Sequence, residues 1–238
     1  MTGWASALLR VHLVCAFGAT AVFWLAASSV KGSPFHRGAG RWFARLIYSA
    51  AATGGLLAVA TLIAPAAVRL PNPAATDAVA RQTSQTMWLV LYVLVIIVAP
   101  VQHGLAVVAA GPQPSRLRTR LHATLCLLAM LGSVVLLPTL VVWSQATWIV
   151  VAPIGFAVGL RQLAYASRAS ATPAEWRREH LTSLITAGVT LHTTLLVFGS
   201  SRMLGWHLSG AAAWLPWVLP ALVGLPIVVW LRRPRPLR

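Results

Sequence analysis

Acidic residues are almost absent from this 238-residue chain, which has 3 Asp plus Glu against 19 Lys plus Arg and a formal net charge of +16. Charged residues make up only 9% of the sequence, against roughly 25% in an ordinary soluble domain. Cysteine is scarce too, with 2 residues, which excludes a disulfide-stapled scaffold. No acid lies within a long apolar run, and this counts against a proton-coupled transporter, because such proteins usually carry a buried carboxylate.

Apolar residues are abundant instead: 58% of the chain is hydrophobic and its mean hydropathy is +0.76. A membrane-spanning helix needs about 20 apolar residues. The sequence therefore predicts an all-α, polytopic membrane bundle of seven transmembrane helices, which forms a single integral-membrane domain over residues 1–238. The seven apolar runs cover residues 11–30, 46–68, 88–110, 121–142, 146–165, 181–198 and 211–231.

The basic residues predict how the bundle is oriented. Basic residues favour the cytoplasmic side of a membrane, and with the N-terminus outside and the C-terminus cytoplasmic, fifteen of them lie on that side and four outside. The cytoplasmic set is Lys31, Arg37, Arg41, Arg45, Arg116, Arg118, Arg120, Arg161, Arg168, Arg177, Arg178, Arg232, Arg233, Arg235 and Arg238, and the outer set is Arg10, Arg69, Arg81 and Arg202. We therefore expect a multi-pass protein of the bacterial inner membrane. Its expected partner is the lipid bilayer, and we expect it to bind no nucleic acid.

Histidines are the ionisable residues that lie on or at the ends of these runs. Counted along the helices at about 1.5 Å per residue, His12 and His192 fall at a similar depth, slightly to the outer side. His103, His122 and His180 fall near the cytoplasmic side. Imidazole is a familiar axial ligand of haem iron. We therefore expect His12 and His192 to face each other as ligands of one haem iron, and His103 with His122, or His180, to bind an inner group.

Further residues fit a haem, although each also has a simpler explanation. Gly188 lies one turn before the outer histidine of the sixth run and would leave room for a flat macrocycle, but glycine also permits close helix packing. Arg118 and Arg120 would pair with haem propionates or anionic lipid headgroups, or would only set the orientation. The outer histidines themselves would, in the alternative, meet a hydroxyl such as that of Thr190 or Ser49.

Two histidine–cysteine pairs leave a copper or zinc site open. Cys15 follows His12 by three residues, and Cys126 follows His122 by four, so each pair shares a helix face. These are ligands that copper and zinc accept. Cysteine in an apolar helix more often packs as a small hydrophobe.

The segment GSPFHRGAGR at residues 32–41 precedes the second apolar run, and the sixth run opens with EHLTSLITAGVTLHTTLLVFG. These segments resemble a group of uncharacterised multi-pass bacterial membrane proteins in which a His-Arg-x-x-Gly-Arg sequence starts an apolar helix. His36, Arg37, Gly40 and Arg41 match that pattern. The resemblance covers about a third of the chain and implies a multi-pass membrane fold with no particular activity. The histidines on helices are also loosely analogous to two-haem membrane cytochromes b.

Three functions remain open at this point. The leading hypothesis is a haem b-binding inner-membrane protein that transfers electrons within or across the bilayer, with a quinone or another membrane subunit as partner, and thus a possible component of a membrane oxidoreductase. The second is a non-catalytic integral subunit or scaffold of a larger membrane complex. The third is a small-molecule carrier, which the lack of internal repeats disfavours.

Overall fold

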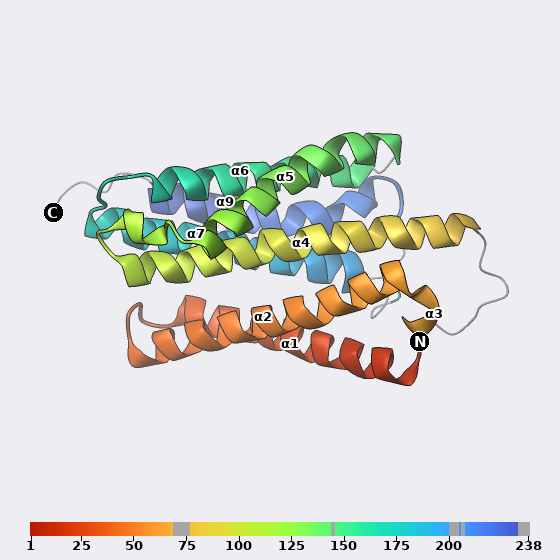
Figure 1. Ribbon diagram of the computed structural model, residues 1–238. Coiled ribbons are helices and arrows are strands. Elements are labelled where there is room, and N and C mark those ends of the chain that lie inside the picture. The colour runs from red at the N-terminus through yellow and green to blue at the C-terminus, as the bar shows by residue number, and fades with distance from the viewer. Residues whose placement is uncertain (69–76, 144–145, 200–204, 206–207, 233–238) are drawn as a thin grey trace. The chain divides into compact units, whose positions relative to one another are not determined.

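The computed structural model describes residues 1–68, 77–143, 146–199, 205 and 208–232, and all regular structure in these ranges is helical (Figure 1). Short 3₁₀ turns (η1, η3) and one π-helical turn (η2) accompany the α-helices. The elements are α1 (Gly3–Ser28), α2 (Pro34–Ile63), α3 (Pro65–Val68), α4 (Asp77–Ala110), η1 (Pro114–Leu117), α5 (Arg120–Val142), α6 (Ala146–Ala166), α7 (Pro173–Thr194), η2 (Leu195–Gly199), η3 (Gly210–Trp214) and α9 (Leu215–Arg232).

Six helical segments of the described ranges are long and apolar enough to cross a bilayer. They are Gly3–Ser28, Pro34–Ile63, Asp77–Ala110, Arg120–Val142, Pro173–Gly199 and Gly210–Ile227. The all-helical multi-pass class expected from composition is therefore confirmed. The fifth apolar run coincides with α6, and the count of seven spans and the orientation of the termini stay predictions.

Several helices start before their apolar runs, because capping residues lie upstream of the apolar segments. Ser33 accepts a hydrogen bond from the backbone of the second helix and is followed by Pro34 at the first helical position. Thr119 caps α5 in the same way. Thr172 caps α7 with a full capping box and is followed by Pro173. The helix that carries the sixth run therefore begins at Pro173, about two turns of polar helix before the predicted start at residue 181.

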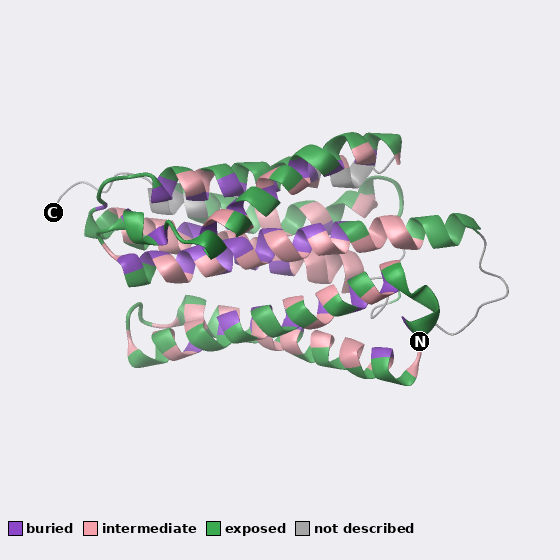
Figure 2. Ribbon diagram, viewed as in Figure 1, coloured by how far each residue is buried: buried purple, intermediate pink, exposed green. Residues whose placement is uncertain are grey.

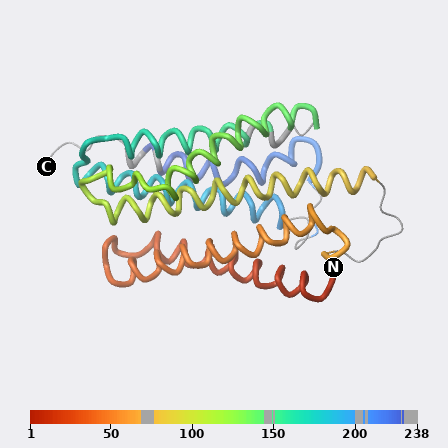
Figure 3. Tube along the Cα trace, in the orientation of Figure 1, coloured from red at the N-terminus to blue at the C-terminus, as the bar shows by residue number. Residues whose placement is uncertain are grey.

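The chain forms two compact units, Met1–Leu94 and Val95–Arg238. In the first unit, α1 and α2 lie antiparallel along their length (Figure 3). The buried positions of α1 are the small residues Ala5, Ala16 and Ala19, and Figure 2 shows most of α1 as intermediate or exposed. Small side chains let two helices approach closely, and exposed apolar side chains on the remaining faces suit lipid.

His36 and Arg37, from the His-Arg sequence, form hydrogen bonds in the connection between α1 and α2. His36 Nδ1 lies 3.1 Å from the carbonyl oxygen of Ala26, near the end of α1. Lys31 Nζ donates to the same carbonyl, and Arg37 donates to the carbonyl of Gly32 at 2.7 Å. Cations satisfy the unpaired carbonyls of a helix end. These residues therefore fix the turn between the two helices.

In the second unit, α5 pairs with α6 and α7 pairs with α9. Two glycines mark close approaches between helices near the polar residues of this unit. A Cβ atom at Gly159 of α6 would lie 2.5 Å from the backbone oxygen of Cys126 on α5, and one at Gly104 of α4 would lie 2.9 Å from Leu184 on α7. A side chain at Gly159 would collide with the α5 backbone, and one at Gly104 would require Leu184 to shift.

Candidate functional site

Two buried histidines of the second unit are hydrogen-bonded to each other. His103 on α4 and His122 on α5 are 0% and 1% exposed. His103 Nδ1 lies 2.8 Å from His122 Nε2, with ring centroids 5.1 Å apart. The sequence placed both residues at one end of the bundle, and the structure brings them into direct contact.

The second nitrogen of His103 reaches a carboxylate. Its Nε2 lies 3.0 Å from Oε1 of Glu179 on α7, and Arg161 on α6 donates to the same oxygen. Arg161 also donates to Ser183 Oγ at 3.1 Å. The side chains of Glu179 and Arg161 are 12% and 25% exposed. Arg161, Glu179, His103 and His122 thus form one connected set, here called the buried network, with one member from each of four helices.

This finding corrects two sequence-based interpretations. The sequence has no acid within a long apolar run, yet Glu179 is a largely buried member of the network. The sequence predicts Arg161 to be one of the cytoplasmic charges that orient the bundle, but it lies in the last third of α6 and pairs with that acid. The absence of a buried carboxylate therefore no longer counts against proton chemistry.

The hydrogen-bond directions follow from the charges. An ionised carboxylate only accepts, so with Glu179 ionised beside Arg161, Nε2 of His103 is the donor. If His103 is neutral, its Nδ1 is then an acceptor, and Nε2 of His122 donates to it. Each link therefore holds one proton between two groups that can exchange it.

Other side chains enclose the network. The ring of Tyr165 meets the His103 ring edge-on, with centroids 5.7 Å apart. The thiol of Cys126 lies 3.8 Å from His122 Nε2 and donates to Oε1 of Gln162 at 3.4 Å. His180 donates through Nδ1 to the carbonyl of Gly104 at 2.8 Å, which ties α7 to α4.

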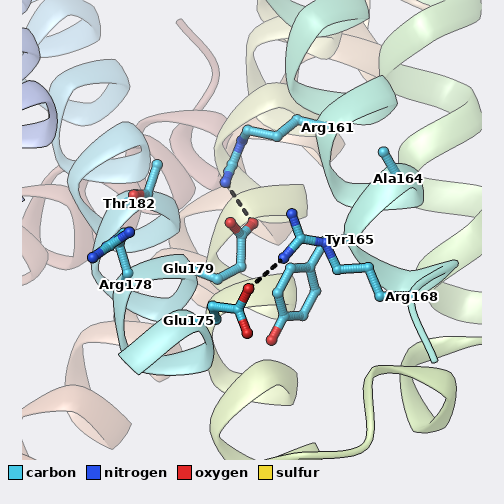
Figure 4. A pocket seen from close by; sticks show the side chains of 8 residues that line it. All are labelled: Arg161, Ala164, Tyr165, Arg168, Glu175, Arg178, Glu179 and Thr182. Carbon is cyan, nitrogen blue, oxygen red and sulfur yellow. Dashed lines mark hydrogen bonds and ion pairs between the residues drawn. The ribbon is translucent and has the colours of Figure 1, made fainter. Parts of the chain in front are cut away.

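A pocket of about 460 Å³ opens beside the network, between the end of α6 and the start of α7. We call it the α6–α7 pocket; its lining residues are Arg161, Ala164, Tyr165, Arg168, Glu175, Arg178, Glu179 and Thr182. Figure 4 shows Arg161 and Glu179 pointing toward each other, with Arg168 reaching Glu175 nearby. Glu179 faces the pocket and bonds to His103, so the pocket and the buried histidines share this carboxylate.

His12, expected as an outer haem ligand, lies in the first unit between α1 and α2. Its Nδ1 lies 2.8 Å from the carbonyl oxygen of Ala50 and 3.5 Å from Thr53 Oγ1. Its ring fills the space above Gly54, where a Cβ would lie 2.8 Å from the ring. The residue thus meets a backbone carbonyl, and Gly54 makes room for it.

His192 lies in the second unit, and its Nδ1 bonds to the carbonyl of Gly188 on its own helix at 2.7 Å. Gly188 is buried, and its carbonyl oxygen is that acceptor. The expectation that His12 and His192 face each other concerns residues of two different units, and it stays a prediction.

The two arginines expected to bind propionates differ in their contacts. Arg118 donates through Nε to the carbonyl of Ala166 at 3.0 Å and through Nη2 to that of Ser167 at 2.9 Å. It therefore caps the C-terminus of α6. Arg120 is an exposed residue at the start of α5.

The buried histidines do not fit one haem iron in this arrangement. Both nitrogens of His103 are already hydrogen-bonded. The facing nitrogens of His103 and His122 are 2.8 Å apart, whereas two axial imidazole nitrogens on opposite sides of one haem iron lie about 4 Å apart, given bonds of roughly 2 Å. Within the part of the chain that the structure describes, no group of three or more His, Cys, Asp or Glu side chains has the arrangement of a metal site.

Arg161 and Glu179 are the members of the buried network that sequence reasoning missed. One signal was present: Arg161 falls inside the apolar run 146–165, and a cation within a span requires a partner. Glu179 is the acid nearest to the following run. The pairing itself depends on the packing of α6 against α7.

Comparison with known proteins identifies no relative: no family model, curated protein or solved structure matches the chain.

Proposed function

We propose that this chain is a multi-pass membrane protein whose second unit transfers protons through the buried network. A single observation carries the proposal: the unbroken series of hydrogen bonds from Glu179, at the α6–α7 pocket, through His103 to His122. Ionisable side chains in membrane helices are costly and usually serve ion or proton pathways.

The series can move a proton without any large rearrangement. A proton that arrives at Nδ1 of His122 releases the proton on its Nε2 to Nδ1 of His103. The proton on Nε2 of His103 then passes to Oε1 of Glu179. One proton enters and one reaches the pocket side, and Arg161 stabilises the carboxylate once that proton has left.

The location and partners belong to the same proposal. The asymmetry of the basic residues supports an inner-membrane protein with seven spans, an outer N-terminus and the α6–α7 pocket at the cytoplasmic side. A quinone, which takes up protons when it is reduced, is a partner that such a network would serve. Membership of the His-Arg-x-x-Gly-Arg group of membrane proteins is part of the same proposal and is supported by His36, Arg37, Gly40 and Arg41.

Proton flux into liposomes tests the proposal. The full-length protein is reconstituted with a pH-sensitive dye inside, and a potassium gradient with valinomycin imposes a membrane potential. We expect flux above that of empty liposomes, and a loss of most of that flux in Glu179→Gln and His122→Gln. Asp77→Asn and His36→Gln make the same chemical changes outside the network and should keep it.

A folding defect must be separated from a transport defect. The double variant Arg161→Gln/Glu179→Gln removes both charges, so it leaves no unpaired charge in the bundle, and it should elute like the wild type in size-exclusion chromatography while still failing to carry protons. Flux equal to that of empty liposomes, or unchanged in Glu179→Gln, would overturn the proposal. The network would then serve to tie four helices together, as in a structural subunit.

A second candidate function, electron transfer by a haem in the first unit, is favoured by the geometry of His12. Its Nδ1 donates to the carbonyl of Ala50, which leaves Nε2 as the nitrogen with a lone pair. Metal-bound histidines are commonly oriented by such a backbone hydrogen bond. A haem would supply a one-electron carrier there.

The absorption spectrum of the purified protein, oxidised and reduced, tests this candidate. A redox-sensitive haem band that disappears in His12→Ala and persists in His36→Gln would support it. A colourless protein from cells with ample haem would exclude it. Proton flux and haem content are separate measurements, so each candidate can fail alone.

A further inference from the structure

The α6–α7 pocket carries more positive than negative charge. Its lining includes Arg161, Arg168 and Arg178 against Glu175 and Glu179, an excess of one positive charge. Two of the arginines are paired with these acids. Among the residues that the structure describes, Arg178 forms no ion pair. The pocket therefore has one positive charge to offer a ligand.

Two buried hydroxyl groups in the lining of this pocket have no hydrogen-bond partner. They belong to Tyr165, which is 5% exposed, and Thr182, which is 3% exposed. The neighbouring threonines of α7 behave differently: Thr186 donates to the carbonyl of Thr182, and Thr190 donates to that of Thr186. A buried hydroxyl without a partner costs roughly 1–3 kcal/mol, so an acceptor in the pocket would be stabilising.

From these features we infer that the α6–α7 pocket binds a singly charged phosphate-type oxyanion. The guanidinium groups can only donate and each hydroxyl has one O–H to donate, and a phosphate-type group offers more oxygens to accept these bonds than a carboxylate does. The single excess positive charge matches a phosphodiester or a monobasic phosphate. A volume of about 460 Å³ lies in the range of small-molecule sites.

Two backbone N–H groups at the start of α7 are already used by its capping box, so we assign the ligand contacts to side chains. Glu175 accepts from the backbone of Thr172, and Thr172 accepts from that of Glu175. This capping box occupies the helix N-terminus, which would otherwise attract an anion. The inference therefore depends on Arg178, Tyr165 and Thr182.

Binding of two probes to the full-length protein tests the inference and separates the two sources of such an anion. The first probe is inorganic phosphate, measured by equilibrium dialysis on the detergent-purified protein. The second is phosphatidylglycerol, whose headgroup is a singly charged phosphodiester, measured by its retention in native mass spectrometry against phosphatidylcholine. Saturable binding of phosphate indicates a soluble ligand, and selective retention of the lipid indicates a headgroup. Binding of neither probe would overturn the inference.

Arg178→Gln and the double variant Tyr165→Phe/Thr182→Val should each weaken binding about tenfold, which is the loss expected for a charge-assisted hydrogen bond or two neutral ones. The matched control is Arg177→Gln. Arg177 is the adjacent arginine of the same helix, but it stacks on Trp176 and is not part of the pocket lining. Wild-type affinity in both pocket variants, or an equal loss in Arg177→Gln, would show that any attraction is a general surface effect and would refute the site. A thermal unfolding midpoint within a few degrees of the wild type confirms that each variant is folded.

Discussion

Removing the carboxylate of Glu179 should destabilise the second unit far more than removing that of Glu175 one turn earlier. The Glu179→Gln change leaves the Arg161 guanidinium, only 25% exposed, without its anion, and weakens the hydrogen bond from His103. Breaking a fully buried ion pair from one side costs about 3–5 kcal/mol. Because both side chains are partly exposed, we expect about 2–3 kcal/mol here.

Glu175→Gln is the matched control for this prediction. Its ion pair with Arg168 joins side chains that are 51% and 42% exposed, and such pairs contribute about 0–1 kcal/mol. Glutamine also suits the capping-box position, so the helix start should survive.

A double-mutant cycle separates the pair from its surroundings. Arg161→Gln/Glu179→Gln should be more stable than Glu179→Gln alone, because no charge is left unpaired, with a coupling of about 1–2 kcal/mol. Equilibrium unfolding in mixed micelles of increasing SDS fraction, followed by tryptophan fluorescence, measures all four proteins. The reasoning is refuted if Glu179→Gln costs no more than Glu175→Gln, or if the two charge removals are additive.

Three further predictions concern packing, capping and orientation. Gly159→Ala should lower the free energy of unfolding several times more than Gly18→Ala in the same assay. The new methyl group at residue 159 would lie 2.5 Å from the backbone oxygen of Cys126, whereas the one at residue 18 would lie 3.4 Å from the flexible end of Leu46. Equal costs would contradict the close approach of α5 and α6. Arg118→Gln should cost about 1 kcal/mol by leaving two carbonyls at the end of α6 without a charged donor, and faster amide exchange at residues 163–167 would locate the effect. Reporter fusions should place the N-terminus outside and the C-terminus in the cytoplasm, and finding both termini on one side would rule out seven spans.

The sequence determined the class of the protein. Length, hydropathy and the scarcity of charge leave only a helical membrane bundle, because the bilayer core requires every backbone group to be satisfied within its own segment. The helix positions could be predicted for the same reason. Their starts were misplaced, since the polar turns after Ser33 and Thr172 carry no apolar signal.

The tertiary structure alone decided the site. Sequence reasoning could single out His103 and His122 as ionisable residues near one end of the bundle, but it paired neither of them with Glu179. Their contact depends on how each helix is rotated about its axis and on how closely α4 and α7 approach at Gly104. Composition and periodicity specify neither the rotation nor the distance. An isolated charge in a helix shows that a partner is needed, whereas the identity of that partner depends on which faces meet. For Arg161 the partner was an acid one helix away, and the two together turn an apparently acid-free bundle into one with a buried, protonatable network.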